Sequence, residues 1–258
     1  MTENSELIGL VSGYVPNFLL ILLRAGVFVA FMPYFSSRSF PAQFKIGLAV
    51  AIAAVLAPVV EFETAGLSMP FVVAREVVFA MALGFSVRFV FYAIDLAGQA
   101  ISYSMGLAMV TSFDPEFGDQ SAEVARLQAA VAGLMFFALD GHHDVVYIFA
   151  RGYEFLPAGQ ADMRALALEA VGLGGRVFVM GLKIAAPVVT GMLVTSILLG
   201  FIYKAAPQIN IFFVSFPIYI FVGFLLMLLS VPVLAHVLGG YFGEIRTEME
   251  RVFAIARG

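Results

Sequence analysis

The chain has 258 residues, of which 62% are hydrophobic and only 12% charged, with a formal net charge of −4. Soluble domains carry about 25% charged residues, so this composition excludes an ordinary soluble protein and predicts an all-α, multi-pass membrane protein in contact with lipid. Cysteine is absent, which excludes disulfides and thiolate metal sites, and no basic block indicates nucleic acid as a partner.

The apolar residues gather in six main segments, which are long enough or nearly long enough to cross a bilayer, a span of about 20 residues. The segments are 14–35, 46–60, 71–94, 127–149, 177–203 and 211–241. The second, with 15 residues between Lys45 and Glu61, is short for a crossing. A seventh segment, 96–113, is rich in Gly and Ser, and we expect either a helix buried in protein or a re-entrant piece.

Five charges lie inside these segments, at Arg24, Arg75, Glu76, Arg88 and Lys183. A charge facing lipid is costly, so such side chains normally face protein or water. We expect them to pair with charges on neighbouring helices. The alternatives are that they line a substrate path, or that parts of the helices are buried in a larger assembly, which also fits the unusual segment lengths.

Bulky apolar side chains recur every four residues around an Asp-Pro break. They are Met105, Met109, Phe113 and Phe117, and the break is Asp114–Pro115. This spacing is most often an ordinary core stripe of a helix. The other interpretation is that adaptable Met and Phe side chains seal a pore against ions and yield to a passing chain.

The motif DGHHDVV gathers Asp140, His142, His143 and Asp144. On a continuous helix, Asp140, His143 and Asp144 share one face and His142 points away. Carboxylates and imidazoles can bind a divalent metal, but three ligands without a fourth elsewhere make a weak pattern. We therefore expect a polar helix break at Gly141 and no metal. No catalytic or nucleotide-binding motif is present, so we expect no enzyme activity, no catalytic residue and no cofactor.

A run without Asp, Glu, Lys or Arg lies between Lys204 and Glu244. It opens with Pro207, Gln208 and Asn210 inside the stretch APQINIFFVSFPIYI. Proline and amide side chains at the start of an apolar run predict a tight turn between two hydrophobic helices.

Five stretches, in this order, resemble the FliR family, the flagellar member of the type III export gate proteins. They are PYFSSRSFPAQFKIGLAV, GLAMVTSFDPEFGDQSAEVARL, FFALDGHHDVV, LPAG and APQINIFFVSFPIYI, and they cover most of the chain from about residue 32 to 220. The injectisome SctT family is similar in architecture. His143 stands where many relatives have an apolar residue, which argues further against a metal.

The resemblance implies a structural and gating subunit of the flagellar export channel, and not an enzyme. Such a subunit assembles with FliP and FliQ homologues, contacts FlhB and FlhA homologues, and passes unfolded flagellar substrates across the bacterial inner membrane at the basal body. It also implies a FliP-like part over residues 1–175 and a FliQ-like helical hairpin over 176–258, with the hairpin turn at 204–210.

The resemblance assigns roles to particular residues as well. It implies that the loop 106–121 plugs the export path, with gate residues Met105, Met109, Phe113, Asp114, Pro115 and Phe117. It implies assembly contacts at Arg75, Glu76, Arg88, Pro207, Gln208 and Asn210, the last three toward FlhB.

The alternative is a stand-alone transporter of ions or small solutes. Arg75, Glu76, Arg88 and Asp140 would then line its path. A transporter built from inverted repeats has paired broken segments in its two halves, and the sequence shows no such pair.

Overall fold

The computed structural model describes residues 2–32, 41–60, 68–107, 122–156, 159–208 and 210–257, without the side chains of 2–13, 122, 211 and 212. Every regular element in these ranges is an α-helix, which confirms the predicted all-α class. The helices are α1 (Thr2–Phe31), α2 (Ala42–Leu56), α3 (Met69–Ser104), α5 (Ala122–Ala138), α6 (Gly141–Phe155), α7 (Met163–Ala205), α8 (Ile211–Gly243) and α9 (Ile245–Arg257).

Several of these helices have the length and composition of membrane spans. In the described ranges, four qualify: the apolar part of α1 (Tyr14–Phe31), α3, α7 and most of α8 (Phe213–Gly243). α5 and α6 add a fifth span only if they are taken together across their break. α2 has 15 residues and is too short, as predicted. The chain is therefore a multi-pass membrane protein.

The predicted seventh segment, 96–113, does not begin a separate helix. Residues 96–104 are the C-terminal end of α3, which has 36 residues. Their polar groups are satisfied along the helix, because Gln99 Nε2 donates to Asp95 Oδ2 at 2.9 Å and Ser104 Oγ donates to the carbonyl of Ile101 at 2.7 Å. Gly and Ser therefore require no break here.

The predicted segment 127–149 is two helices rather than one. The chain turns at Leu139 and Asp140, and Asp140 has φ 56°. This left-handed conformation ends a helix and is rare outside glycine, although Asp tolerates it. The apolar segment 127–149 therefore contains a break, and the helix break predicted at Gly141 is confirmed directly before that residue.

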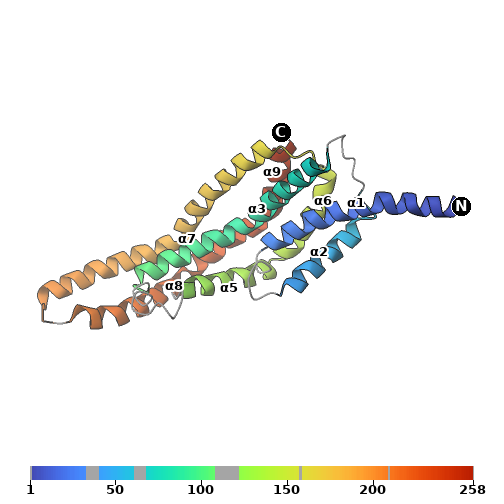
Figure 1. Ribbon diagram of the computed structural model, residues 1–258. Helices are drawn as coiled ribbons and strands as arrows, with labels where there is room; N and C mark the ends of the chain where they lie inside the picture. The colour runs from blue at the N-terminus through green and yellow to red at the C-terminus, as the bar shows by residue number, and fades with distance from the viewer. Residues whose placement is uncertain are drawn as a thin grey trace. The chain divides into compact units, whose positions relative to one another are not determined.

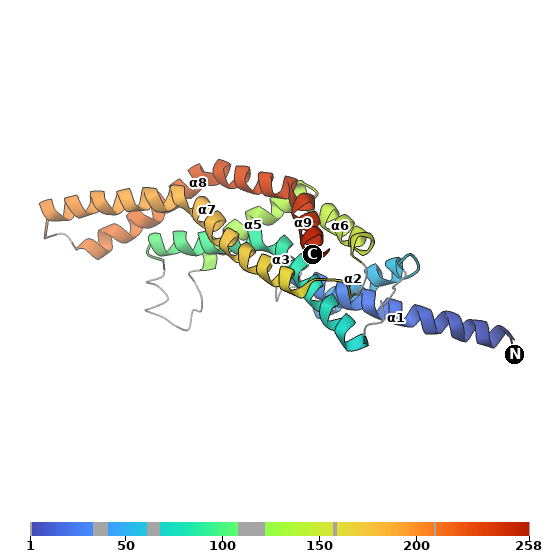
Figure 2. The same ribbon diagram turned by 90° about the horizontal axis from the view of Figure 1, so that it is seen from above.

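The helices form two compact units. Unit 1 comprises Met1–Phe89, Asp140–Gly174 and Glu244–Gly258. In unit 1, α1 lies along α2, and α9 packs on α6 (Figures 1 and 2). Phe28 of α1 stacks on Phe149 of α6 with ring centroids 4.4 Å apart, which places an aromatic core between these helices.

Unit 2 comprises Val90–Leu139 and Gly175–Gly243, and contains the hairpin of α7 and α8 (Figure 1). Its helices approach closely at glycines. A Cβ atom on Gly98 of α3 would lie 2.7 Å from the Cβ of Ala125 in α5, and one on Gly191 of α7 would lie 2.6 Å from Leu226 Cδ1 in α8. Small residues at such contacts let membrane helices pack closely, where lipid supplies no hydrophobic driving force.

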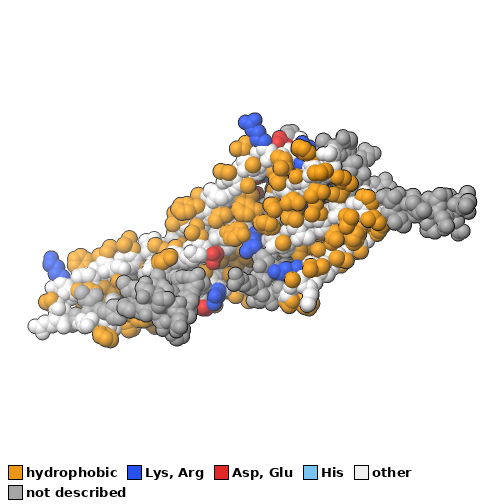
Figure 3. All heavy atoms as spheres, viewed as in Figure 1, with side chains coloured by type: hydrophobic (Ala, Val, Ile, Leu, Met, Phe, Trp, Pro, Cys, Tyr) orange, Lys and Arg blue, Asp and Glu red, His pale blue; other side chains and the backbone are white. Residues whose placement is uncertain are grey.

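Hydrophobic side chains cover much of the described surface that faces the viewer in Figure 3. On α7 and α8 the large exposed ones include Phe178, Phe201, Phe213, Phe221 and Leu228, and Phe213 is 75% exposed. An apolar surface of this kind is unfavourable in water and indicates contact with lipid or with other proteins.

Candidate functional site

A buried ion pair joins α1 and α3 in unit 1. Arg24 Nη2 donates to Glu76 Oε1 at 2.9 Å, and Arg24 Nε donates to Glu76 Oε2. Both side chains are 1% exposed. A bidentate pair of this kind, with two parallel hydrogen bonds, is stronger than a single-contact Arg–carboxylate pair. For these two residues, the expectation of partners on neighbouring helices is confirmed.

The same pair holds the turn that follows α6. Glu76 Oε1 accepts the backbone N–H of Gly159 at 3.0 Å, and Arg24 Nη2 reaches the carbonyl of Leu156 at 3.5 Å. Arg75, adjacent to Glu76, donates to the carbonyl of Gly159 at 2.7 Å. The adjacent charges therefore do not pair with each other, as their angular separation on a helix predicts, but fix one turn together.

Aromatic rings cover the buried guanidinium. Arg24 Cζ lies 4.2 Å from the ring centroid of Tyr153 and 4.9 Å from that of Phe79. A ring face attracts a desolvated cation and replaces part of its lost hydration. The pair is thus enclosed by protein, so it offers no open path to a solute.

The other two charges that sequence placed inside spans lie on α3 and α7. Arg88 of α3 is half-buried, and Lys183 of α7 is exposed. The assembly contacts expected at Arg75, Glu76 and Arg88 stay predictions.

Of the six expected gate residues, the structure describes one. Met105 follows the end of α3 and is fully buried. It packs on Gly223 of α8, where an added Cβ would lie 2.6 Å from Met105 Cε. Met109, Phe113, Asp114, Pro115 and Phe117 lie outside the described residues.

The polar turn lies between α7 and α8. α7 ends at Ala205 and α8 begins at Ile211. Pro207, Gln208 and Asn210 are all exposed, so their side chains are accessible to another protein. Whether FlhB makes that contact stays a prediction.

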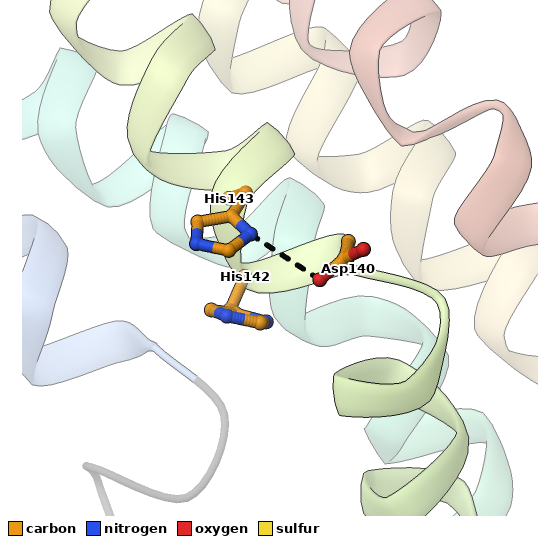
Figure 4. A group of neighbouring side chains, drawn as sticks. All are labelled: Asp140, His142 and His143. Atoms are coloured by element: carbon orange, nitrogen blue, oxygen red, sulfur yellow. Dashed lines mark hydrogen bonds and ion pairs between the residues drawn. The ribbon is translucent and has the colours of Figure 1, made fainter.

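The DGHHDVV motif begins with the left-handed Asp140 and continues as the first turn of α6. Asp140, His142 and His143 bring one ligand atom each to within 4.8 Å of one another (Figure 4). The predicted shared face was therefore wrong in two respects. Asp140 is not helical, so the rotation rule does not apply to it, and His142 joins the group. Asp144 instead accepts hydrogen bonds from Arg246 of α9, with Nε at 2.7 Å.

The docking of α9 on α6 was not predicted from the sequence. Arg257 Nε donates to the carbonyl of Phe155 at 2.7 Å, and Phe253 is 2% exposed and stacks on Phe155 at 5.7 Å. The backbone of Asp162 donates to the carbonyl of Ala256 at 2.8 Å. The sequence does contain a pattern that predicts an amphipathic helix here, because apolar residues within 245–257 recur at helical spacing between charged residues.

Comparisons with known proteins give one consistent result. The family described as bacterial export proteins, family 1, matches residues 15–245. The flagellar biosynthetic protein FliR of Pectobacterium carotovorum subsp. carotovorum is 31% identical over 236 residues, which are 90% of this chain and 90% of that protein. FliR of Escherichia coli (strain K12) is 31% identical over 228 residues, 87% of each. The secretion system apparatus protein SsaT of Salmonella typhimurium is 24% identical over 177 residues, 64% of each.

Proposed function

This chain belongs to the FliR family of bacterial export proteins, and we propose that it serves as a structural and gating subunit of the flagellar type III protein export channel. In this role it assembles with FliP and FliQ homologues in the bacterial inner membrane at the basal body. FlhB and FlhA homologues are its further partners, and unfolded flagellar proteins pass through the channel.

The observation that carries this proposal is the extent of the family match. Residues 15–245 include the apolar part of α1, all the helices from α2 to α8, and the first residue of α9. The relatives named FliR align over about nine-tenths of this chain. The large exposed apolar side chains of α7 and α8 support an assembled state, since neighbouring subunits would cover part of them.

The domain assignment and the gate are part of the proposal. A FliP-like part covers residues 1–175, and a FliQ-like hairpin covers 176–258, supported by the helix–turn–helix of α7 and α8. The loop 106–121 closes the path. Met105 directly precedes this loop, and its burial against Gly223 supports a fixed attachment of the loop to α8.

A stand-alone solute transporter is not supported. The matching family is described as bacterial export proteins, and the similar proteins are named as a flagellar biosynthetic protein and a secretion system apparatus protein. Two of the charges that would line a solute path have opposite environments, because the side chain of Glu76 is 1% exposed and paired, whereas that of Asp140 is 73% exposed.

Affinity purification from membranes tests the proposal. The tagged full chain, expressed with its own FliP and FliQ homologues, is solubilised in mild detergent and the eluted proteins are identified. We expect both homologues in a defined complex. A monodisperse chain without either partner that transports a solute in vesicles would contradict the proposal.

A further inference from the structure

We propose that Asp140, His142 and His143 form a binding site for one divalent transition-metal ion of the zinc and copper class. This inference does not depend on the export function. It departs from the absence of a metal expected from the sequence, because the sequence did not show that His142 joins Asp140 and His143. All three residues lie in unit 1, within the first turn of α6 and the residue before it.

The spacing of the ligand atoms fits such an ion. Metal–nitrogen and metal–oxygen bonds of about 2.0–2.2 Å place tetrahedral ligands roughly 3.4 Å apart. His143 Nδ1 and Asp140 Oδ1 are already 3.3 Å apart. All three ligand atoms lie within 4.8 Å of one another, and the rings of His142 and His143 have centroids 4.1 Å apart (Figure 4). Small side-chain rotations therefore bring the third atom to bonding distance.

The backbone of Asp140 creates this arrangement. With φ 56°, Asp140 turns back over the helix that follows it instead of continuing the rotation of α6. Its carboxylate lies close to the imidazoles of His142 and His143, which stand two and three residues later in the chain. The left-handed residue therefore adds a carboxylate ligand to the two adjacent imidazoles in the first turn of α6.

The type of ligand selects the type of metal. Two imidazoles and one carboxylate suit Zn²⁺, Cu²⁺ or Ni²⁺, whereas Mg²⁺ and Ca²⁺ require mostly oxygen ligands. The side chains of Asp140 and His143 are 73% and 74% exposed, so water can complete the coordination.

The neighbouring charges do not oppose the ion. Arg246 is held by Asp144, with Nε 2.7 Å from Oδ1, and its Cζ lies 5.1 Å from the ring centroid of Tyr147. Asp144 is thus committed to α9 and neutralises this cation, while the carboxylate of Asp140 has a histidine as its partner. The negative charge of Asp140 offsets the repulsion between a cation and the helix N-terminus.

The chain offers a matched control for a binding test. It has three histidines and no cysteine, and the third histidine, His236, lies exposed on α8. The purified full chain is stripped with a chelator, titrated with Zn²⁺ and desalted before its zinc is counted. We expect about one Zn²⁺ per chain in the wild type and in His236→Asn, since a three-ligand site holds one ion.

Variants of the ligands complete the test. His143→Asn and Asp140→Asn should each bind Zn²⁺ at least about tenfold more weakly, because losing even an outer partner of a metal ligand has an effect of that size. Asn keeps the left-handed backbone of residue 140 accessible. Zn²⁺ should raise the Tm of the wild type and of His236→Asn, but not that of His143→Asn or Asp140→Asn. Without metal, all four proteins should have the same Tm.

A spectrum identifies the ligands directly. Bound Cu²⁺ should show hyperfine coupling to imidazole nitrogen in its paramagnetic resonance spectrum, and His143→Asn should remove part of it. The proposal is overturned if the wild type retains no Zn²⁺ after desalting, or if His236→Asn loses as much of it as His143→Asn.

Discussion

Arg24 of α1 and Glu76 of α3 are 52 residues apart in the sequence and form a two-point ion pair that is almost completely buried. Because the same two side chains bond the backbone at Leu156 and Gly159, the pair links two helices to the turn between α6 and α7. The sequence places these two charges inside apolar segments, but it does not show that they hold this turn.

Removal of one partner should therefore destabilise the chain strongly. Glu76→Ala leaves a buried guanidinium without its carboxylate, a change that costs about 3–5 kcal/mol. Thermal unfolding in detergent and the yield of the export complex measure the effect. Glu123→Ala is the control, since Glu123 pairs with Arg126 at the surface, where pairs contribute about 0–1 kcal/mol.

The double variant Arg24→Leu/Glu76→Leu should be more stable than either single replacement, because apolar side chains carry no unpaired buried charge. Equal stability of Glu76→Ala and Glu123→Ala would show that burial of the pair contributes nothing.

The contact between Met105 and Gly223 has no space for another carbon atom. Gly223→Ala places a Cβ 2.6 Å from Met105 Cε and Cγ, and overpacking of this kind costs about 1–3 kcal/mol. We expect a lower Tm, partly restored in the double variant Met105→Ala/Gly223→Ala. Gly200→Ala on α7 is the control, since nothing lies within 4 Å of its added Cβ. Equal Tm values for Gly223→Ala and Gly200→Ala would count against the contact.

Packing, more than charge, should hold α9 on α6. Phe253→Ala removes a buried ring and should lower the free energy of unfolding of this region by about 3–5 kcal/mol. Arg246→Ala removes a pair in which the arginine side chain is 54% exposed, a loss of about 1 kcal/mol or less. Limited proteolysis should cleave the C-terminal helix much faster in Phe253→Ala. Faster cleavage of Arg246→Ala would reverse this ranking.

The exposed turn between α7 and α8 should bind a partner without supporting the core complex. Gln208→Ala/Asn210→Ala removes two side-chain amides able to donate and accept hydrogen bonds. We expect weaker capture of the FlhB homologue and unchanged capture of FliP and FliQ homologues. Thr247→Ala/Glu250→Ala on α9 serves as a polar control, since both residues are exposed. Wild-type capture of FlhB by the turn variant would contradict the proposed contact.

The sequence predicts those features that depend on local pattern. The apolar run 211–241 gave α8 almost to the residue, and the Asp140–Gly141 pair marked a true helix break. The polar and small residues of segment 96–113 led us to expect a separate element, but up to Ser104 they belong to α3. The side chains of Gln99 and Ser104 form their hydrogen bonds within that helix.

Tertiary pairing could not be predicted in this way. The sequence marked Arg24 and Glu76 as costly charges but gave no reason to choose between partners, because their contact depends on how distant helices pack. The position of His142 was missed because a rotation rule for helices was applied across the left-handed Asp140.

Ion leakage through the assembled channel tests the gating role most directly. Residues 110–118 lie outside the described part of the chain, and their deletion removes Phe113, Asp114, Pro115 and Phe117 of the proposed plug while leaving Met105 and Met109 in place. A hydrophobic constriction excludes ions by dewetting, so cells that express the deletion should show raised ion conductance or solute influx, with the complex at wild-type yield. A deletion complex that assembles normally and stays as tight as the wild type would contradict the proposed gate.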